Sequence, residues 1–106
     1  GKVLLIEGDG SLLMHIQELE TIRRHGIRLL MAVINDGGYG AEIHKFRAHG
    51  MSAETVIHGR GDLAGVANGF GVRGTTVNAL GRMAGLFAEH QAANSAGLWD
   101  VHTDDT

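Results

Sequence analysis

The sequence has no cysteine and no proline among its 106 residues. Without cysteine it can form neither a disulfide framework nor a thiolate site. Its longest apolar runs, residues 3–6 and 29–34, are far too short to span a bilayer as a helix. The N-terminus shows no charged region followed by an apolar stretch, as a signal peptide would. These absences favour a cytoplasmic protein.

An excess of one charge sign is also missing. The formal net charge is −3, with acidic and basic residues mixed along the chain. No cluster of Lys and Arg is present, so we expect neither a nucleic-acid partner nor a membrane surface. A hydrophobic content of 43% and a charged content of 20% are typical of a globular domain. This length corresponds to one domain or part of one.

The spacing of apolar residues predicts strands that alternate with helices. Near-continuous apolar runs indicate buried strands at residues 2–7, 28–34, 72–77 and 98–103, the last with Trp99 in the core. Helical spacing and caps predict helices at residues 12–25, 41–48 and 62–70, and a fourth from Asn78. Alternation of this kind predicts an α/β fold with three layers, α-β-α, and a mainly parallel sheet of about four strands.

Three details of these helices are testable in a structure. The first is one continuous helix with Leu12, Ile16, Leu19 and Ile22 on its apolar face, and Met14 is expected to pack in the core or a pocket. Asp62 is the expected N-cap of the third helix. The fourth helix should present Leu80, Met83, Ala84 and Phe87 on one face. Residues 49–61 are expected to be irregular.

Polar, glycine-rich loops follow the first two strands. In an open parallel sheet, ligands bind beyond the carboxyl ends of the strands, so residues 8–11 and 35–40 should face one site. Asp9 lies between two glycines before a helix whose free N–H groups suit a phosphate. A carboxylate at a phosphate site is reasonable if a divalent cation lies between them. Asp9, Asp36, one loop carbonyl, two phosphate oxygens and a water would complete an octahedral Mg²⁺ shell.

Each loop alone is a common turn, but the pair is more specific. Gly8-Asp9-Gly10, a helix and a strand in residues 11–34, and then Asn35-Asp36 resemble the thiamine-diphosphate motif of the acetolactate synthase and 2-oxo acid decarboxylase superfamily. Further similarities lie at residues 17–19 (QEL), 38–40 (GYG), 62–64 (DLA), 70–71 (FG) and 98–101 (LWDV). The resemblance covers essentially the whole chain and implies thiamine diphosphate and Mg²⁺ as cofactors.

The resemblance also implies a role for each loop residue. Asp9 and Asp36 would ligate Mg²⁺ through their side chains and Gly38 through its carbonyl; many relatives carry Asn in place of Asp36. Gly10 and Ser11, with Gly8 before them, would contact the diphosphate, and Tyr39 and Gly40 would shape the cofactor pocket. Glu42 falls where some decarboxylases of this family have an active-site glutamate.

The family has parts that these residues do not contain. Its cofactor binds between two domains, usually from two subunits, and a separate pyrimidine-binding domain supplies the glutamate that activates the cofactor. We therefore expect residues 1–106 to be one partial domain that lacks at least one preceding strand–helix unit and is not catalytic alone. The whole enzyme would be a homo-oligomeric lyase or transferase with a 2-oxo acid substrate.

Other interpretations remain open. A truncated, non-catalytic remnant could act as an interaction module. A receiver domain of bacterial signalling has a similar fold and length, but it needs a phosphoacceptor Asp after a mid-chain strand, and Asp62 follows Gly-Arg-Gly. The seven histidines lack the spacing that places two of them on one helical face, so a zinc site is not expected.

Overall fold

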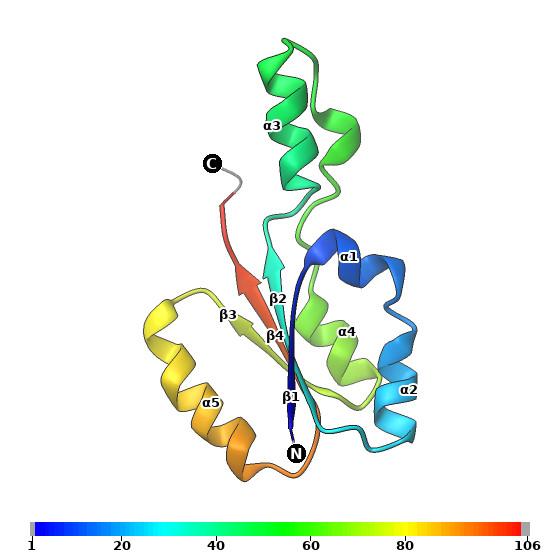
Figure 1. Cartoon of the computed structure of the whole chain (residues 1–106), viewed down its shortest axis with the longest axis vertical. Helices are drawn as coiled ribbons and strands as arrows, with labels where there is room; N and C mark the ends of the chain where they lie inside the picture. The colour runs from blue at the N-terminus through cyan, green and yellow to red at the C-terminus, as the bar shows by residue number, and fades with distance from the viewer. Residues whose placement is uncertain (1, 105–106) are drawn as a thin grey trace.

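The structure is a computed structural model that describes residues 2–104. Its strands are β1 (Val3–Gly8), β2 (Leu29–Asn35), β3 (Arg73–Val77) and β4 (Gly97–His102). They form one parallel sheet in the order β1-β2-β4-β3 (Figure 1). The predicted α/β fold with a four-stranded parallel sheet is confirmed.

Helices cover both faces of this sheet. One face carries α1 (Asp9–Met14), α2 (Glu18–Arg24) and α4 (Leu63–Gly69), and the other carries α5 (Met83–Ala92) (Figure 1). Right-handed crossovers explain this division. The chain advances in one direction across the sheet from β1 to β2 and on to β3, and then steps back to β4. The helix of that last connection therefore lies on the opposite face.

Each face has its own apolar core. Leu12, Leu19, Met31, Leu63 and Leu98 belong to the core beneath α1, α2 and α4. The core beneath α5 is built from Leu30, Ala32, Val77, Trp99 and Val101. The prediction that Trp99 lies in a strand and packs in the core is confirmed.

The segment between β2 and α4 extends past the sheet. It contains α3 (Gly40–Ala48) and a 3₁₀ turn, η1 (Glu54–Val56), and rises beyond the carboxyl ends of the strands (Figure 1). It returns to α4, where Asp62 caps the first turn by accepting a hydrogen bond from the Gly65 N–H at 2.9 Å, as predicted. No helix within residues 2–104 is long and apolar enough to cross a membrane.

The predicted continuous helix over residues 12–25 is wrong. The structure breaks it into α1 and α2 at residues 15–17, where hydrogen bonds tighten to three-residue turns such as His15 N to the Leu12 carbonyl. At the same place, the imidazole of His15 contacts Glu7, with 2.8 Å between Nε2 of His15 and Oε2 of Glu7. Both Leu12 and Leu19 still reach the core, whereas Met14 is exposed and does not pack as predicted.

The predicted burial of the first strand is also wrong. β1 is an edge strand with β2 as its neighbour, and Val3, Leu4 and Ile6 are 62%, 55% and 65% exposed. The fourth helix differs as well. A 3₁₀ turn, η2 (Leu80–Arg82), precedes α5, so Asn78 is not its cap. Met83 and Leu86 face the core, while Leu80 and Phe87 are exposed, so of the four residues of the predicted face Met83 alone packs on the sheet.

Candidate functional site

The register of the strands brings the two predicted loops together. Gly8 pairs with Ile34, so Asp9 and Asn35, the next residue on each strand's path, lie at the same edge of the sheet. Asn35 in turn pairs with His102 of β4. The carboxyl ends of β1, β2 and β4 thus meet at one place, as the sequence predicted for the first two.

Asp9 is a buried carboxylate at this end of the sheet. It is 2% exposed, and its Oδ2 accepts a hydrogen bond from the Gly37 N–H at 3.1 Å. The same oxygen lies 3.5 Å from Nε2 of His58. A backbone amide from the second loop therefore holds the carboxylate of the first.

Asp36 adds a second carboxylate beside Asp9. Burial raises the pKa of Asp9, and the negative charge of Asp36 raises it further, against smaller opposing effects of a backbone hydrogen bond and of His58. Asp36 is itself positioned by its own turn, because its Oδ1 accepts a hydrogen bond from the Gly38 N–H at 3.3 Å. Two like charges held together in this way favour a cation between them.

The glycines of the two loops permit close approaches. Gly37 has a φ of 79°, which a residue with a side chain rarely adopts. A Cβ on Gly10 would lie 2.6 Å from Cε1 of Tyr39, so α1 and this ring can touch only if residue 10 is glycine. A Cβ on Gly40 would collide with the Asp36 carboxylate. The loops are therefore fitted to each other.

The carbonyl of Gly38 is available at the centre of this turn. Gly38 forms an isolated antiparallel bridge with Ile57, through hydrogen bonds made by its neighbours rather than by its own carbonyl. Among residues 2–104, no donor reaches the Gly38 oxygen. The Gly38 carbonyl is therefore free to accept a further contact within the turn that carries Asp36.

The remaining predicted residues lie around this centre. Gly8 is the last residue of β1, and Ser11 is exposed in α1 with its hydroxyl donating to Oε2 of Glu7 at 3.2 Å. Tyr39 precedes α3 and Gly40 begins it. Glu42 lies exposed in the first turn of α3, beyond the strand ends.

Residues 49–61, expected to be irregular, contain η1 and return to the site, a contribution that the sequence did not predict. The N–H groups of His58 and Gly59 donate to the Gly37 carbonyl at 3.1 and 2.8 Å. The ring of His58 packs edge-on against Tyr39, with 5.4 Å between the ring centroids. The spacing of His58 from the two loops carries no signal that could have identified it.

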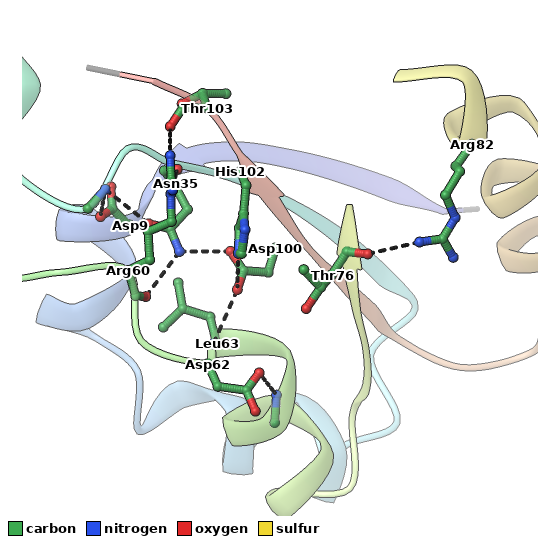
Figure 2. A network of polar contacts seen from close by, with 12 residues as sticks. Asp9, Asn35, Arg60, Asp62, Leu63, Thr76, Arg82, Asp100, His102 and Thr103 are labelled. Carbon is green, nitrogen blue, oxygen red and sulfur yellow. Dashed lines mark hydrogen bonds and ion pairs between the residues drawn. The ribbon is translucent and has the colours of Figure 1, made fainter. Parts of the chain in front are cut away.

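Asn35 and Asp100 form a second missed feature, below the loops (Figure 2). Both are fully buried, and Asn35 Nδ2 donates to Asp100 Oδ1 at 2.8 Å. The signal for Asp100 was present, because a carboxylate inside the apolar run at residues 98–101 is unusual unless it is paired.

Comparison with known proteins decides the family. Residues 1–101 match the family described as "Thiamine pyrophosphate enzyme, C-terminal TPP binding domain". The chain belongs to this family. As a C-terminal domain of thiamine pyrophosphate enzymes, it cannot be a receiver domain, and Asp62 is a helix cap rather than a phosphoacceptor at a strand end.

Two acetolactate synthases illustrate the similarity of this domain to known proteins. It is 31% identical over 102 residues to the putative acetolactate synthase large subunit IlvB2 of Mycobacterium tuberculosis, covering 96% of this chain and 18% of that protein. It is 33% identical to the probable chloroplastic acetolactate synthase 2 of Oryza sativa subsp. japonica, covering 93% and 17%.

The fold of the domain has a solved counterpart. The thiamine diphosphate-dependent 4-hydroxybenzoylformate decarboxylase of Rhodococcus jostii RHA1 matches with a TM-score of 0.84 and 25% identity, covering 97% of this chain and 19% of that one. The domain therefore spans less than a fifth of the length of each of these relatives.

Proposed function

We propose that this domain holds the diphosphate of thiamine diphosphate through Mg²⁺, with Asp9, Asp36 and the Gly38 carbonyl as the protein's metal ligands. The observation that carries the proposal is the buried Asp9, fixed by the Gly37 amide beside a second carboxylate and an unpaired carbonyl. Gly8, Gly10 and Ser11 would border the diphosphate, and Tyr39 and Gly40 would shape the pocket.

The donor set fits this metal in its chemistry. All three donors are hard oxygens, and within residues 2–104 no three acidic, histidine or cysteine side chains gather into a cage of their own. Mg²⁺ is usually bound in this incomplete way, through one or two carboxylates, with phosphate oxygens and water supplying the rest of an octahedron. The metal and the diphosphate should therefore bind together.

The whole enzyme, we propose, is a homo-oligomeric lyase or transferase that acts on a 2-oxo acid. The relatives are named for acetolactate synthesis and for 4-hydroxybenzoylformate decarboxylation, which supports this class. Bound thiamine diphosphate supplies an electron sink for making or breaking a C–C bond. A pyrimidine-binding domain, from the same or another subunit, would complete the pocket, and this domain alone would not turn over substrate.

Within that enzyme, Glu42 is the residue of this chain that we propose faces the substrate. Its position in the first turn of α3, exposed and two residues past Gly40, supports the proposal. Replacing Glu42 by Gln should lower kcat while the affinity for thiamine diphosphate stays unchanged. A loss of cofactor affinity with normal kcat would contradict this role.

Thermal unfolding with thiamine diphosphate and Mg²⁺ tests the cofactor proposal. A ligand present at 100 times its dissociation constant stabilises the native state by about 2.7 kcal/mol, so Tm should rise clearly. Asp9→Asn should abolish the rise, while Glu89→Gln, a carboxylate change on α5, should leave it intact. If the unchanged protein shows no rise at any concentration, a non-catalytic remnant or interaction module becomes the better description.

A further inference from the structure

Asn35 is the last residue of β2, and its side chain ties three separate segments together. Its Oδ1 accepts a hydrogen bond from the Gly37 N–H at 3.1 Å. Its Nδ2 donates to the Arg60 carbonyl at 3.1 Å and to Asp100 Oδ1 at 2.8 Å (Figure 2). Both amide hydrogens and the carbonyl oxygen are therefore used inside the protein, and Asn35 is fully buried.

Asp100 is the fixed point of this arrangement. It lies within β4, is fully buried, and accepts from Asn35 with one oxygen and from the Leu63 N–H, at the start of α4, with the other at 3.3 Å. His102 lies on the same side, with Nε2 at 3.3 Å from Asp100 Oδ2. A buried carboxylate is costly unless it is hydrogen-bonded, and Asp100 is held by the Asn35 side chain at the end of β2 and by the Leu63 amide at the start of α4.

The Gly37 amide connects this pair to the proposed metal site. The same N–H lies 3.1 Å from Asn35 Oδ1 and 3.1 Å from Asp9 Oδ2. The orientation of Asp9 thus depends on an amide that Asn35 holds, and Asn35 is oriented by Asp100. Asn35 and Asp100 are not among the proposed metal or diphosphate contacts.

We infer that the Asn35–Asp100 pair positions the metal ligands Asp9, Asp36 and Gly38, and thereby makes the site selective for Mg²⁺ over larger cations. This inference rests on the proposed function. Mg²⁺ demands near-ideal octahedral geometry at about 2.0–2.1 Å, whereas Ca²⁺ accepts irregular shells at about 2.3–2.6 Å. A loop that a rigid pair holds in place suits Mg²⁺, and a loosened loop should favour Ca²⁺.

The test uses Asp100→Asn, which keeps the shape of residue 100 but cannot accept from both Asn35 and the Leu63 N–H. Removing an outer partner of metal ligands typically costs about 10–100-fold in metal affinity. We expect the Kd for Mg²⁺, measured in the presence of thiamine diphosphate, to rise by this factor, and the Kd for Ca²⁺ to change much less. The double variant Asn35→Asp/Asp100→Asn again pairs an amide with a carboxylate but leaves the Arg60 carbonyl without its donor, so it should recover only part of the preference for Mg²⁺.

Leu98→Ala is the matched control for lost stability. Leu98 is fully buried two residues earlier on β4, so its truncation destabilises the fold through packing alone. It should lower Tm and leave the ratio of the Mg²⁺ and Ca²⁺ constants unchanged. An unchanged ratio in Asp100→Asn as well would overturn the inference and leave the proposed function standing.

A second measurement does not depend on metal binding. In the metal-free protein, the Gly37 amide should exchange its hydrogen faster in Asp100→Asn than in the unchanged protein. The Leu98→Ala variant, measured in the same way, shows how much exchange increases through lower stability alone. Equal Gly37 exchange in Asp100→Asn and the unchanged protein would contradict the positioning role. Absence of any Mg²⁺ or thiamine diphosphate binding in the unchanged protein would instead contradict the proposed function.

Discussion

The carboxyl end of the sheet and the β1 edge depart in opposite ways from the usual distribution of side chains. The first buries polar side chains, and the second exposes apolar ones. Four polar or charged residues are buried within residues 2–104, and three of them, Asp9, Asn35 and Asp100, lie at the carboxyl end. The β1 edge instead exposes apolar side chains, Val3, Leu4 and Ile6, beside the exposed Phe87 of α5. A cavity of about 270 Å³ lies between this strand and α5, lined also by Leu30 and His90.

Buried polar residues and exposed apolar residues suit different purposes. Burying polar groups costs stability, so a cluster of buried, hydrogen-bonded polar residues is expected where geometry must be fixed for a ligand. An exposed apolar patch does not orient a ligand, but it favours association with another surface. We therefore propose cofactor binding for the first region and assembly for the second.

The largest expected effect comes from removing polarity at the carboxyl end. Asn35→Leu keeps the approximate size of the side chain but takes a partner from Asp100, Gly37 and the Arg60 carbonyl. Each buried group that loses its partner costs about 1–3 kcal/mol, so we expect the free energy of unfolding to fall by about 3 kcal/mol. Urea denaturation measures this change.

Asn78→Leu is the comparison for that variant. Asn78 is exposed just past the end of β3, so its replacement should change the free energy of unfolding by no more than about 0.5 kcal/mol. Equal losses for the two substitutions would show that the buried asparagine is not special.

The next effect concerns the charges of Asp9 and Asp36. Because the pKa of Asp9 in the fold is raised above its ordinary value of 3.8, its contribution to stability is fully present below that value and is lost as pH rises through the raised pKa. Asp36→Asn removes the neighbouring charge, and we expect it to stabilise the metal-free protein modestly at pH 7 and to flatten this dependence. Unfolding measured from pH 3.8 to pH 7 checks both points, and a destabilised Asp36→Asn would contradict them.

A smaller effect on stability is expected at the apolar edge. Ile6→Lys places a charge on an exposed position of β1, so the free energy of unfolding should change by no more than about 0.5 kcal/mol. Self-association, measured by sedimentation velocity, should nevertheless decrease. Unaltered association would mean that the β1 edge is not an assembly surface.

The smallest expected effect is the acid response of His90, which is opposite in sign to that of Asp9. Burial lowers the pKa of His90 below its ordinary value of 6.5, with Lys2 and Arg73 adding to the shift. Its neutral form fits the fold, so stability is lost as pH falls through 6.5. His90→Gln should remove this loss in thermal unfolding between pH 7 and pH 5.5, and an unchanged slope would contradict it.

The sequence predicted more of the carboxyl end than of the edge. Both loops were found because Gly8-Asp9-Gly10 and Asn35-Asp36 follow apolar strands, and local sequence marks such turns well. The burial of Val3, Leu4 and Ile6 was mispredicted because an apolar run reads the same in a central strand and in an edge strand. Only the strand order distinguishes the two cases.

Other features depended on contacts between distant residues. The contact between His15 and Glu7, at the point where the predicted helix is interrupted, joins residues that no periodicity pairs. The contact of His58 with Asp9 and the hydrogen bond between Asn35 and Asp100 also join residues far apart in the chain. The apolar run around Asp100 signals that this carboxylate is paired, but it does not identify the residue with which it pairs.

A divalent cation, we propose, binds between Asp9, Asp36 and the Gly38 carbonyl when thiamine diphosphate is present. Mn²⁺ can replace Mg²⁺ in oxygen sites, and its unpaired electrons broaden nearby amide resonances in NMR spectra. We predict selective broadening at Gly10, Gly37 and Gly38 that requires thiamine diphosphate and disappears in Asp9→Asn. Broadening centred elsewhere, or persisting fully in Asp9→Asn, would contradict the account.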